Sequence, residues 1–440
     1  MIEACFVLFL ICLVLYAFYV LTKKTCFALN LSAGSVWSLL LYREFVVIFL
    51  PILLLIFYGS EPFTDYIFNI KDDKIFSISL IVIYAIFVFS LTIFVLSKYL
   101  PVLISKEDKA KSIDDPRVKK FANASLACGF AILLFSYIFL SYEHAFLRAL
   151  LSGDGLIKIR LANSYASKLP SQVSYFIVFA SQIAAIFSSI HLINKKYFRF
   201  LMYFSCALFL ASARGDKAPV LMCIILAILS YFYIKGLVVS LGKILFGVFF
   251  SLLLLYFSIY FVASLQIPNL SIDVFNVYLL GRLGVGQMGG VFETFSISKI
   301  KGDYFWHTIP FAQFFVNYIP YDKMLMMVTE GYDFDAMGVK NSLFISEAYG
   351  IGGMLLVFIS PFVVGCSYVL GSYLLFEILK KLYGRSVAVV YAIPLYLLSS
   401  ALTGGFSSFP FLKGILLNLF ALLFVWVIYK TMNINLRNAN

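Results

Sequence analysis

The sequence predicts an all-α fold: a polytopic integral membrane protein with about eleven transmembrane helices. Hydrophobic residues make up 62% of the 440-residue chain and charged residues only 13%, whereas a soluble globular protein carries roughly 25% charged residues. The apolar residues also occur in long runs, and a helix needs about 20 such residues to cross a bilayer. These two observations exclude a soluble enzyme and predict one membrane domain that comprises residues 1–440.

Eleven apolar runs are candidate spans. They are residues 3–22, 41–58, 75–97, 122–142, 172–193, 197–212, 218–234, 243–263, 342–379, 386–403 and 411–430. The run 342–379 is too long for one straight crossing, and its glycines at 350, 352 and 353 and Pro361 predict a break or a re-entrant start. Residues 27–40 are predicted to lie at the membrane interface. The first run has no basic segment before it and is predicted to be a retained span, not a signal peptide.

Basic residues predict the orientation of these spans. The segment 98–120 contains Lys98, Lys106, Lys109, Lys111, Arg117, Lys119 and Lys120. The positive-inside rule places such a segment in the cytoplasm. With eleven crossings, the N-terminus and the long segment 264–341 then lie outside and the C-terminus lies inside. The basic pI of about 9.2 is explained by anchoring to the anionic inner leaflet, so no nucleic-acid partner is expected.

The segment 264–341 is the longest interruption between apolar runs. It contains the glycine-rich sequence GRLGVGQMGG (281–290) and the aromatic sequence YFWHTIPFAQFFVNYIPY (304–321), which includes His307. Simple channels and many carriers need no such loop. We therefore expect the chemistry of this protein in a large extracytoplasmic loop.

The sequence indicates neither a metal site nor a cofactor site. It lacks a P-loop and the GxSxG and HExxH motifs, and its three histidines (His144, His191 and His307) are scattered. Its seven cysteines stand singly and fit the role of small apolar packing residues. Asp333 and Asp335 could share a metal ion only on an extended segment, and a solvated loop explains them better.

The first candidate site is the sequence SARGDKAP (212–219), which lies between two short apolar runs. Arg214, Asp216 and Lys217 should lie slightly below the outer surface, where charges are costly unless they are paired or face a wet cavity. Two cations there would suit a diphosphate. The alternative is a hairpin turn from which Arg214 extends to the lipid headgroups.

The glycine-rich segment supplies Arg282, Gln287 and Glu293 as further candidates for binding a diphosphate. It is not expected to bind a dinucleotide, because no strand of a βαβ unit precedes it. An arginine can hold phosphate oxygens in bidentate fashion, and on one helix Arg282, Gly286, Gly289 and Glu293 would share a face. The alternative is close helix packing through small residues.

His307 and Glu347 are the candidate catalytic residues. His307, between aromatic residues and a proline, could orient a sugar or accept a proton from its hydroxyl; the alternative is a residue of an interfacial aromatic belt. Glu347 lies in NSLFISEAYGIGG (341–353) at the start of a long apolar run. A carboxylate there is expected to pair with Arg214 or Arg282, or to act as the base.

These features together resemble the bacterial O-antigen and capsule repeat-unit polymerases, the Wzy family. The resemblance lies in about a dozen spans, one large outer loop late in the chain, and arginines on outer segments. It also lies in the ARG turn (213–215), the glycine-rich segment (281–290) and the SEAYG–GG sequence (346–353). It covers most of the chain but depends on short motifs. The related O-antigen ligases carry a clear catalytic histidine in this loop, and here His307 is the only candidate.

The resemblance implies a GT-C-like membrane glycosyltransferase in the bacterial inner membrane. Such a polymerase joins undecaprenyl-diphosphate-linked oligosaccharide repeat units into O-antigen or capsular polysaccharide on the outer face. It implies a metal-independent reaction without a cofactor, in which arginines stabilise the leaving diphosphate and the protein orients the acceptor hydroxyl. A chain-length regulator is the implied protein partner.

Two other function classes stay open. One is a flippase or another transporter of lipid-linked oligosaccharides, which would more often show two related halves with charges inside the bundle. The other is a sensor or assembly scaffold whose loop binds a partner.

Overall fold

The computed structural model describes residues 2–22, 37–68, 70–98, 106–140, 142–152, 171–236, 271–297, 300–310, 315–331 and 340–437, with a few single residues between these ranges. Within these ranges the secondary structure consists of α-helices and short 3-10 helices, without strands. The predicted all-α fold is therefore confirmed for the part of the chain that is described.

Eight of the described helices are long and apolar enough to cross a membrane. They are α1 (Ile2–Thr22), α2 (Ser38–Tyr58), α3 (Asp72–Ser97), α5 (Pro116–Leu140), α8 (Ser171–Ile193), α10 (Lys217–Lys235), α15 (Phe344–Tyr383) and α17 (Lys413–Arg437). Each corresponds to one of the predicted apolar runs. The chain is thus a multi-pass helical membrane protein.

Two further predicted spans form shorter helices, α9 (Tyr197–Ala211) and α16 (Arg385–Ser399), of 15 residues each. At 1.5 Å per residue each is about 22 Å long, less than the roughly 30 Å of a hydrocarbon core. The predicted span 386–403 therefore ends early, because the chain turns after Ser399 into two 3-10 helices, η5 (Leu402–Gly404) and η6 (Phe406–Ser408). The predicted span 243–263 lies almost wholly outside the described residues.

The prediction of an interfacial segment at 27–40 is wrong at its end, because α2 begins at Ser38. Trp37 precedes this helix and is buried, with its ring 5.4 Å from the ring of Tyr233 on α10. This packing keeps the first turn of α2 inside the bundle. Residues 27–36 lie outside the described part.

The predicted break in the long run at 342–379 is confirmed at Gly353. This residue has φ +66° and ψ −158°, a conformation that is open essentially only to glycine. It divides α15 into a short first piece, from Phe344 to Gly352, and a long second piece. The first piece contains Glu347. Because of the break, its axis need not be parallel to that of the second piece.

The described part of the loop contains three α-helices, α12 (Ile272–Leu283), α13 (Gly289–Ser296) and α14 (Tyr321–Glu330), and the 3-10 helices η2 (Val285–Gln287) and η3 (Tyr304–Thr308). It also has a small apolar core of its own, formed by Tyr304, Tyr321 and Leu325. The prediction that Arg282 and Glu293 share a face of one helix is wrong, because the chain leaves the helical conformation at Gly284 (φ −100°, ψ −94°).

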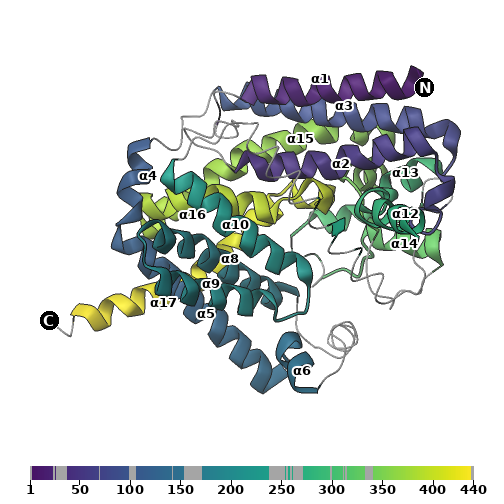
Figure 1. Ribbon diagram of the computed structural model, residues 1–440. Helices are drawn as coiled ribbons and strands as arrows, with labels where there is room; N and C mark the ends of the chain where they lie inside the picture. The colour runs from purple at the N-terminus through teal and green to yellow at the C-terminus, as the bar shows by residue number, and fades with distance from the viewer. Residues whose placement is uncertain are drawn as a thin grey trace.

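The helices lie side by side in two groups (Figure 1). The first group contains α1, α2, α3 and α15, and the second contains α5, α8, α9, α10 and α17. Two short helices, α4 (Lys106–Ile113) and α6 (Ala145–Ser152), lie near their ends. The loop helices α12, α13 and α14 lie at the end of the molecule where the N-terminus lies, opposite the C-terminus.

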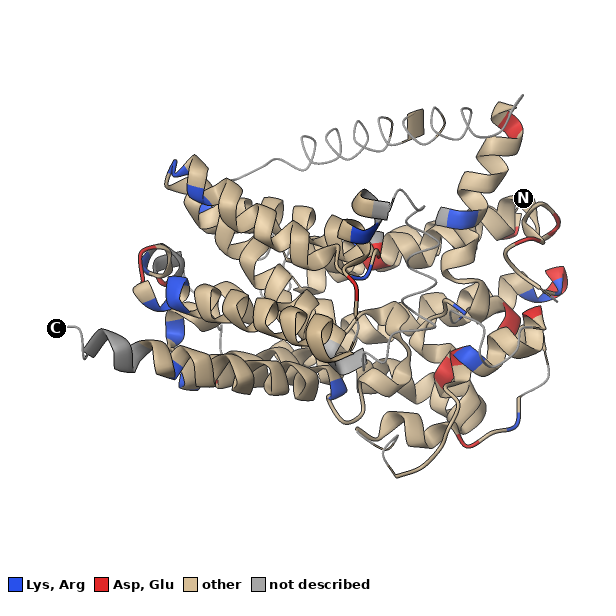
Figure 2. Ribbon diagram, turned by 90° about the horizontal axis from the view of Figure 1, so that it is seen from below, with Lys and Arg blue, Asp and Glu red and all other residues tan. Residues whose placement is uncertain are grey.

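Charged residues gather at the two ends of the helices (Figure 2). Lys and Arg predominate at the end with the C-terminus, and residues of both signs lie at the opposite end, with a mostly uncharged stretch between them. This distribution is what the positive-inside rule requires when the C-terminus is cytoplasmic. We call the end with the loop the outer end, because the sequence predicts that it lies outside.

Candidate functional site

The two predicted catalytic residues lie in direct contact. His307 is carried by η3 and Glu347 by the first piece of α15, and His307 Nδ1 lies 2.6 Å from Glu347 Oε1. The other carboxylate oxygen, Oε2, accepts a hydrogen bond of 2.7 Å from the backbone N–H of Ser407. The expected pairing of Glu347 with Arg214 or Arg282 is therefore wrong. The carboxylate is satisfied by a histidine and a backbone amide instead.

The turn formed by η5 and η6, residues 402–408, is shaped to hold this carboxylate. Gly405 has φ +86°, and a Cβ atom at this position would lie only 2.7 Å from Glu347 Oε2. A glycine is thus required here both by the backbone conformation and by the close approach of the carboxylate. Lys413, at the start of α17, donates a hydrogen bond of 3.2 Å to the backbone carbonyl of His307, so the site joins the loop to three parts of the membrane domain.

Asp322, in the first turn of α14, is a further acidic group near this pair. Burial raises the pKa of Asp322, the negative charge of Glu347 raises it further, and His307 lowers it. Sequence analysis missed Asp322, Ser407 and Lys413. Asp322 directly follows the aromatic sequence 304–321, which is the one signal that could have found it. Ser407 lies in the short segment before the last span and Lys413 at the start of that span, and neither belongs to a recognisable motif.

The geometry of the pair orients the imidazole ring. When Nδ1–H donates to Glu347, Nε2 is left as a hydrogen-bond acceptor. The side chain of His307 is 21% exposed, whereas that of Glu347 is only 6% exposed. This arrangement can accept a proton from a hydroxyl group at Nε2, while the buried carboxylate stabilises the imidazolium that forms.

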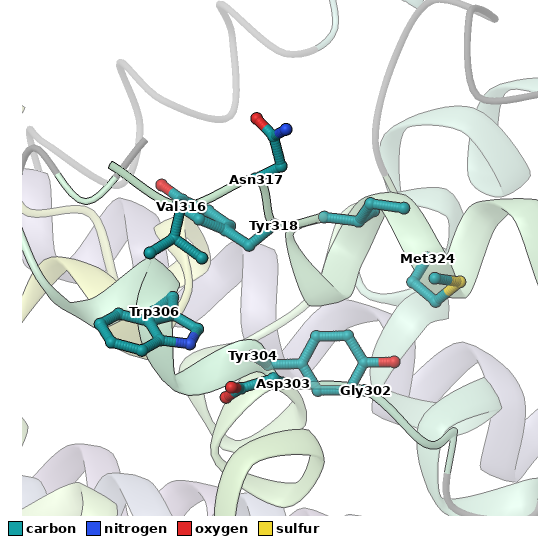
Figure 3. A pocket seen from close by; sticks show the side chains of 9 residues that line it. Gly302, Asp303, Tyr304, Trp306, Val316, Asn317, Tyr318 and Met324 are labelled. Carbon is teal, nitrogen blue, oxygen red and sulfur yellow. The ribbon is translucent and has the colours of Figure 1, made fainter. Parts of the chain in front are cut away.

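A cavity of 640 Å³ lies beside this pair. We call it the aromatic cavity; it is lined by Gly302, Asp303, Tyr304, Trp306, Val316, Asn317, Tyr318, Ile319 and Met324. Trp306 and Tyr304 lie on one side of it and Val316, Asn317 and Tyr318 lie opposite (Figure 3). The ring of Tyr318 is 5.5 Å from the ring of His307, and the volume falls in the usual range of about 300–1,000 Å³ for small-molecule sites.

The predicted arginines lie elsewhere on the outer side. Arg214 Nε is 3.3 Å from Asp216 Oδ2, and its Nη1 is 3.5 Å from Ser174 Oγ. Arg282 Nη1 donates a hydrogen bond of 3.2 Å to the hydroxyl of Tyr278, one turn earlier on α12. No contact between the two arginines occurs among the described residues, so their convergence on one ligand stays a prediction. Lys217 begins α10, and its side chain is outside the described part.

Gln287 and Glu293 both have partners within the fold. Gln287 Nε2 donates to the carbonyl of Arg282 at 2.9 Å. Glu293 is fully buried, and its Oε1 lies 2.9 Å from Lys340 Nζ and accepts a hydrogen bond of 2.7 Å from the backbone N–H of Phe68. Lys340 also lies 2.5 Å from Glu330. These contacts give Glu293 a structural role, because they join α13 to the end of the loop at Lys340 and to the segment between α2 and α3 at Phe68.

No group of three or more potential metal ligands occurs among the residues that the structure describes. The aspartates at 333 and 335 lie outside them. The expectation of a metal-independent reaction therefore stays a prediction.

Comparison with known proteins adds no assignment. No protein-family model matches the chain, and neither curated proteins nor solved structures include a significant match. The function is therefore inferred from the geometry of the site and from the sequence motifs.

Proposed function

We propose that this protein is a glycosyltransferase of the repeat-unit polymerase type, which joins oligosaccharide units carried on undecaprenyl diphosphate at the outer face of a bacterial inner membrane. The observation that carries the proposal is the 2.6 Å contact between His307 and Glu347 beside the aromatic cavity. A base of this kind is what a transferase needs for its acceptor, and a simple channel or a scaffold does not need one.

In the proposed reaction His307 is the general base. Its Nε2 accepts the proton of the acceptor hydroxyl while that oxygen forms a bond with the anomeric carbon of the donor. The bond from this carbon to the lipid diphosphate breaks, and the diphosphate leaves with the electron pair. Glu347 holds the imidazole in the required tautomer, a role that contributes to the roughly 10²–10⁴-fold effect of general-base catalysis.

The aromatic cavity is the proposed site of the acceptor sugar. Trp306 and Tyr318 offer flat apolar faces to the C–H faces of a sugar ring, and Asp303 and Asn317 offer hydrogen-bond partners for its hydroxyls. Trp306 precedes His307 in the chain, so a sugar stacked on this ring would bring a hydroxyl near the base. A lipid-linked donor needs no activation by a nucleotide, which agrees with the lack of nucleotide-binding motifs in the sequence.

Reconstitution with a lipid-linked repeat unit tests the proposal. The purified wild-type protein should convert single units into chains, and His307→Ala or Glu347→Gln should reduce the rate by about 10²–10⁴-fold. His191→Phe is the matched control, because His191 is a buried histidine of α8, away from the dyad, whose ring stacks on Tyr203 of α9 and meets Phe187 of its own helix edge-on. It should retain activity.

Three results would contradict the proposal. Wild-type protein that moves units across a bilayer without joining them would favour the transporter. Full activity in His307→Ala, at a normal level of folded protein, would exclude His307 as the base. Loss of activity on removal of divalent cations, restored by adding Mg²⁺, would show that the reaction requires a divalent metal ion.

A further inference from the structure

Helix α2 contains an Arg–Glu pair that none of the sequence motifs includes. Arg43 and Glu44 lie in its second turn, and the residues around them from Ser38 to Tyr58 are mostly apolar. Charged residues inside a membrane span are costly unless they are paired or face a cavity, and for that reason they mark functional sites. The pair therefore needs an explanation beyond packing.

The pair lines a cavity of 210 Å³ between α2, α8, α10, α15 and α16. We call it the intramembrane cavity. The side chain of Glu44 is 6% exposed, whereas that of Arg43 is 42% exposed. The carboxylate is thus enclosed by protein, and the guanidinium remains accessible at the cavity wall.

The contacts of the pair leave donors of Arg43 available. Glu44 is satisfied at both oxygens: Oε1 contacts Arg43 Nη2, and Oε2 accepts a hydrogen bond of 3.2 Å from Thr403 Oγ1. On Arg43, the Nη1 group meets the sulfur of Met222 at 3.7 Å, and a thioether sulfur is only a weak acceptor. An incoming oxyanion would be a far better partner for this donor.

The cavity lies partway along the bundle. On one side, Met222 is only five residues from the start of α10 at Lys217, a distance of about 8 Å along the helix, and Leu397 and Leu398 lie in the last turn of α16. On the other side, Leu40 and Leu41 belong to the first turn of α2, which begins at the opposite end of the bundle in the predicted orientation.

Arg214 does not line this cavity but lies close to residues that do. Its contact Ser174 is one helical turn from Val178 on α8, and Val178 lines the cavity, as does Ala218, four residues after Arg214. The turn 402–408 contacts both sites, since Thr403 donates to Glu44 in the cavity and the N–H of Ser407 donates to Glu347 of the dyad.

We propose that the intramembrane cavity binds the phosphate headgroup of a membrane lipid, with Arg43 as the ligand at its floor. The volume of 210 Å³ is below the roughly 300–1,000 Å³ of drug-sized sites, so it suits a small headgroup and not an oligosaccharide. Arg43 presents a planar fork that matches phosphate oxygens, and Glu44 holds this fork in place. In the polymerase, this headgroup is the donor's diphosphate, an assignment that rests on the proposed function.

Ligand binding by the purified protein in a phosphate-free maltoside detergent tests the site without requiring polymerisation. The probes are undecaprenyl diphosphate, inorganic diphosphate and phosphatidylglycerol, each followed by native mass spectrometry and by titration. The variants are Arg43→Lys and the double variant Arg43→Gln with Glu44→Gln, which leaves no carboxylate unpaired. Arg385→Lys is the matched control, because Arg385 forms a comparable pair with Asp108 at the opposite end of the bundle.

We expect Arg43→Lys to weaken the binding of undecaprenyl diphosphate about tenfold, which corresponds to about 1.4 kcal/mol. The control should bind like wild type. An Arg43-dependent binding of phosphatidylglycerol instead would support the site and identify its ligand as a bilayer phospholipid. Equal binding of all three probes to wild type and to folded Arg43 variants would overturn the proposal. A failure of polymerisation alone would concern the proposed function and not this site.

Discussion

At the scale of single residues, the dyad shows how burial and partners assign different roles to neighbouring groups. Glu347 is held on both oxygens, by the ring of His307 and by the amide of Ser407. Asp322 accepts a hydrogen bond of 2.9 Å at Oδ1 from the backbone N–H of Lys323, and burial raises its pKa. Asp322 is therefore expected to titrate at a higher pH than an ordinary aspartate.

Asp322→Asn tests the raised pKa of Asp322 through the pH dependence of stability. A carboxyl group with a raised pKa in the folded state contributes stability at low pH, below the unfolded value of about 3.9, and loses it as pH rises through the folded pKa. Asparagine keeps the acceptor for the Lys323 N–H but does not titrate. The melting temperature of Asp322→Asn should therefore exceed that of wild type by more at pH 8 than at pH 4, measured in detergent.

Asp65→Asn serves as the control for this experiment, because Asp65 is exposed. The difference in melting temperature between Asp65→Asn and wild type should not increase from pH 4 to pH 8. A constant difference between Asp322→Asn and wild type across this range would contradict the raised pKa of Asp322.

At the scale of elements, neighbouring glycines in the turn 402–408 are predicted to respond differently to alanine. In Gly405→Ala the new Cβ atom would lie 2.7 Å from Glu347 Oε2 at a φ of +86°, whereas in Gly404→Ala the nearest atom would be 3.9 Å away. Gly405 also has ψ +157°, and this backbone conformation is essentially restricted to glycine and costs another residue about 1–3 kcal/mol. The carboxylate must also move.

We therefore expect Gly405→Ala to lower both thermal stability and the proposed transferase activity, and Gly404→Ala to change neither appreciably. The measurements are the melting temperature and the rate of chain growth for the two variants side by side. Equal behaviour of the two variants would show that the turn does not position Glu347.

A cluster of Lys340, Glu293 and Glu330 holds the loop together. The cluster also fixes the loop to the segment between α2 and α3, because Lys340 Nζ donates to the carbonyl of Tyr66 and the N–H of Phe68 donates to Glu293. The side chain of Lys340 is 7% exposed and that of Glu293 is fully buried. Removing one partner of a buried ion pair leaves an uncompensated charge and typically costs about 3–5 kcal/mol. Lys340→Met should destabilise the protein by this amount, and adding Glu293→Gln should recover much of it.

Lys301→Met provides the surface reference for this measurement, because Lys301 is exposed. Its effect should stay within about 0.5 kcal/mol. A Lys340→Met variant as stable as this reference would mean that the cluster does not hold the loop.

At the scale of the whole molecule, the orientation in the membrane is the prediction on which the proposed function depends. In a variant without its native cysteines, a cysteine at Lys301 should react with a membrane-impermeant reagent in intact spheroplasts. A cysteine at Lys111, in the basic segment 98–120, should react only after lysis. The opposite pattern would place the loop in the cytoplasm, where lipid-linked polymerisation at the outer face is impossible.

The sequence alone determined the class of the molecule and most of its helices. An apolar run of about 20 residues folds as an α-helix in lipid, because every backbone N–H and C=O must form its hydrogen bond within the segment. The break in the long run at Gly353 was predicted for the same kind of local reason, since glycine tolerates backbone that other residues do not. His307 and Glu347 were identified because a titratable group in apolar surroundings is conspicuous in any sequence.

Only the tertiary structure decided which of these groups meet. His307 and Glu347 are 40 residues apart, and Ser407 and Thr403 come from a turn with no motif of its own. The pairing depends on where the broken helix α15 and the short helix α16 end relative to each other. Arg43 and Glu44 were not identified from the sequence, because it shows two adjacent charges but not the cavity that they line. Periodicity and composition are local properties of a chain, whereas a site is set by long-range packing.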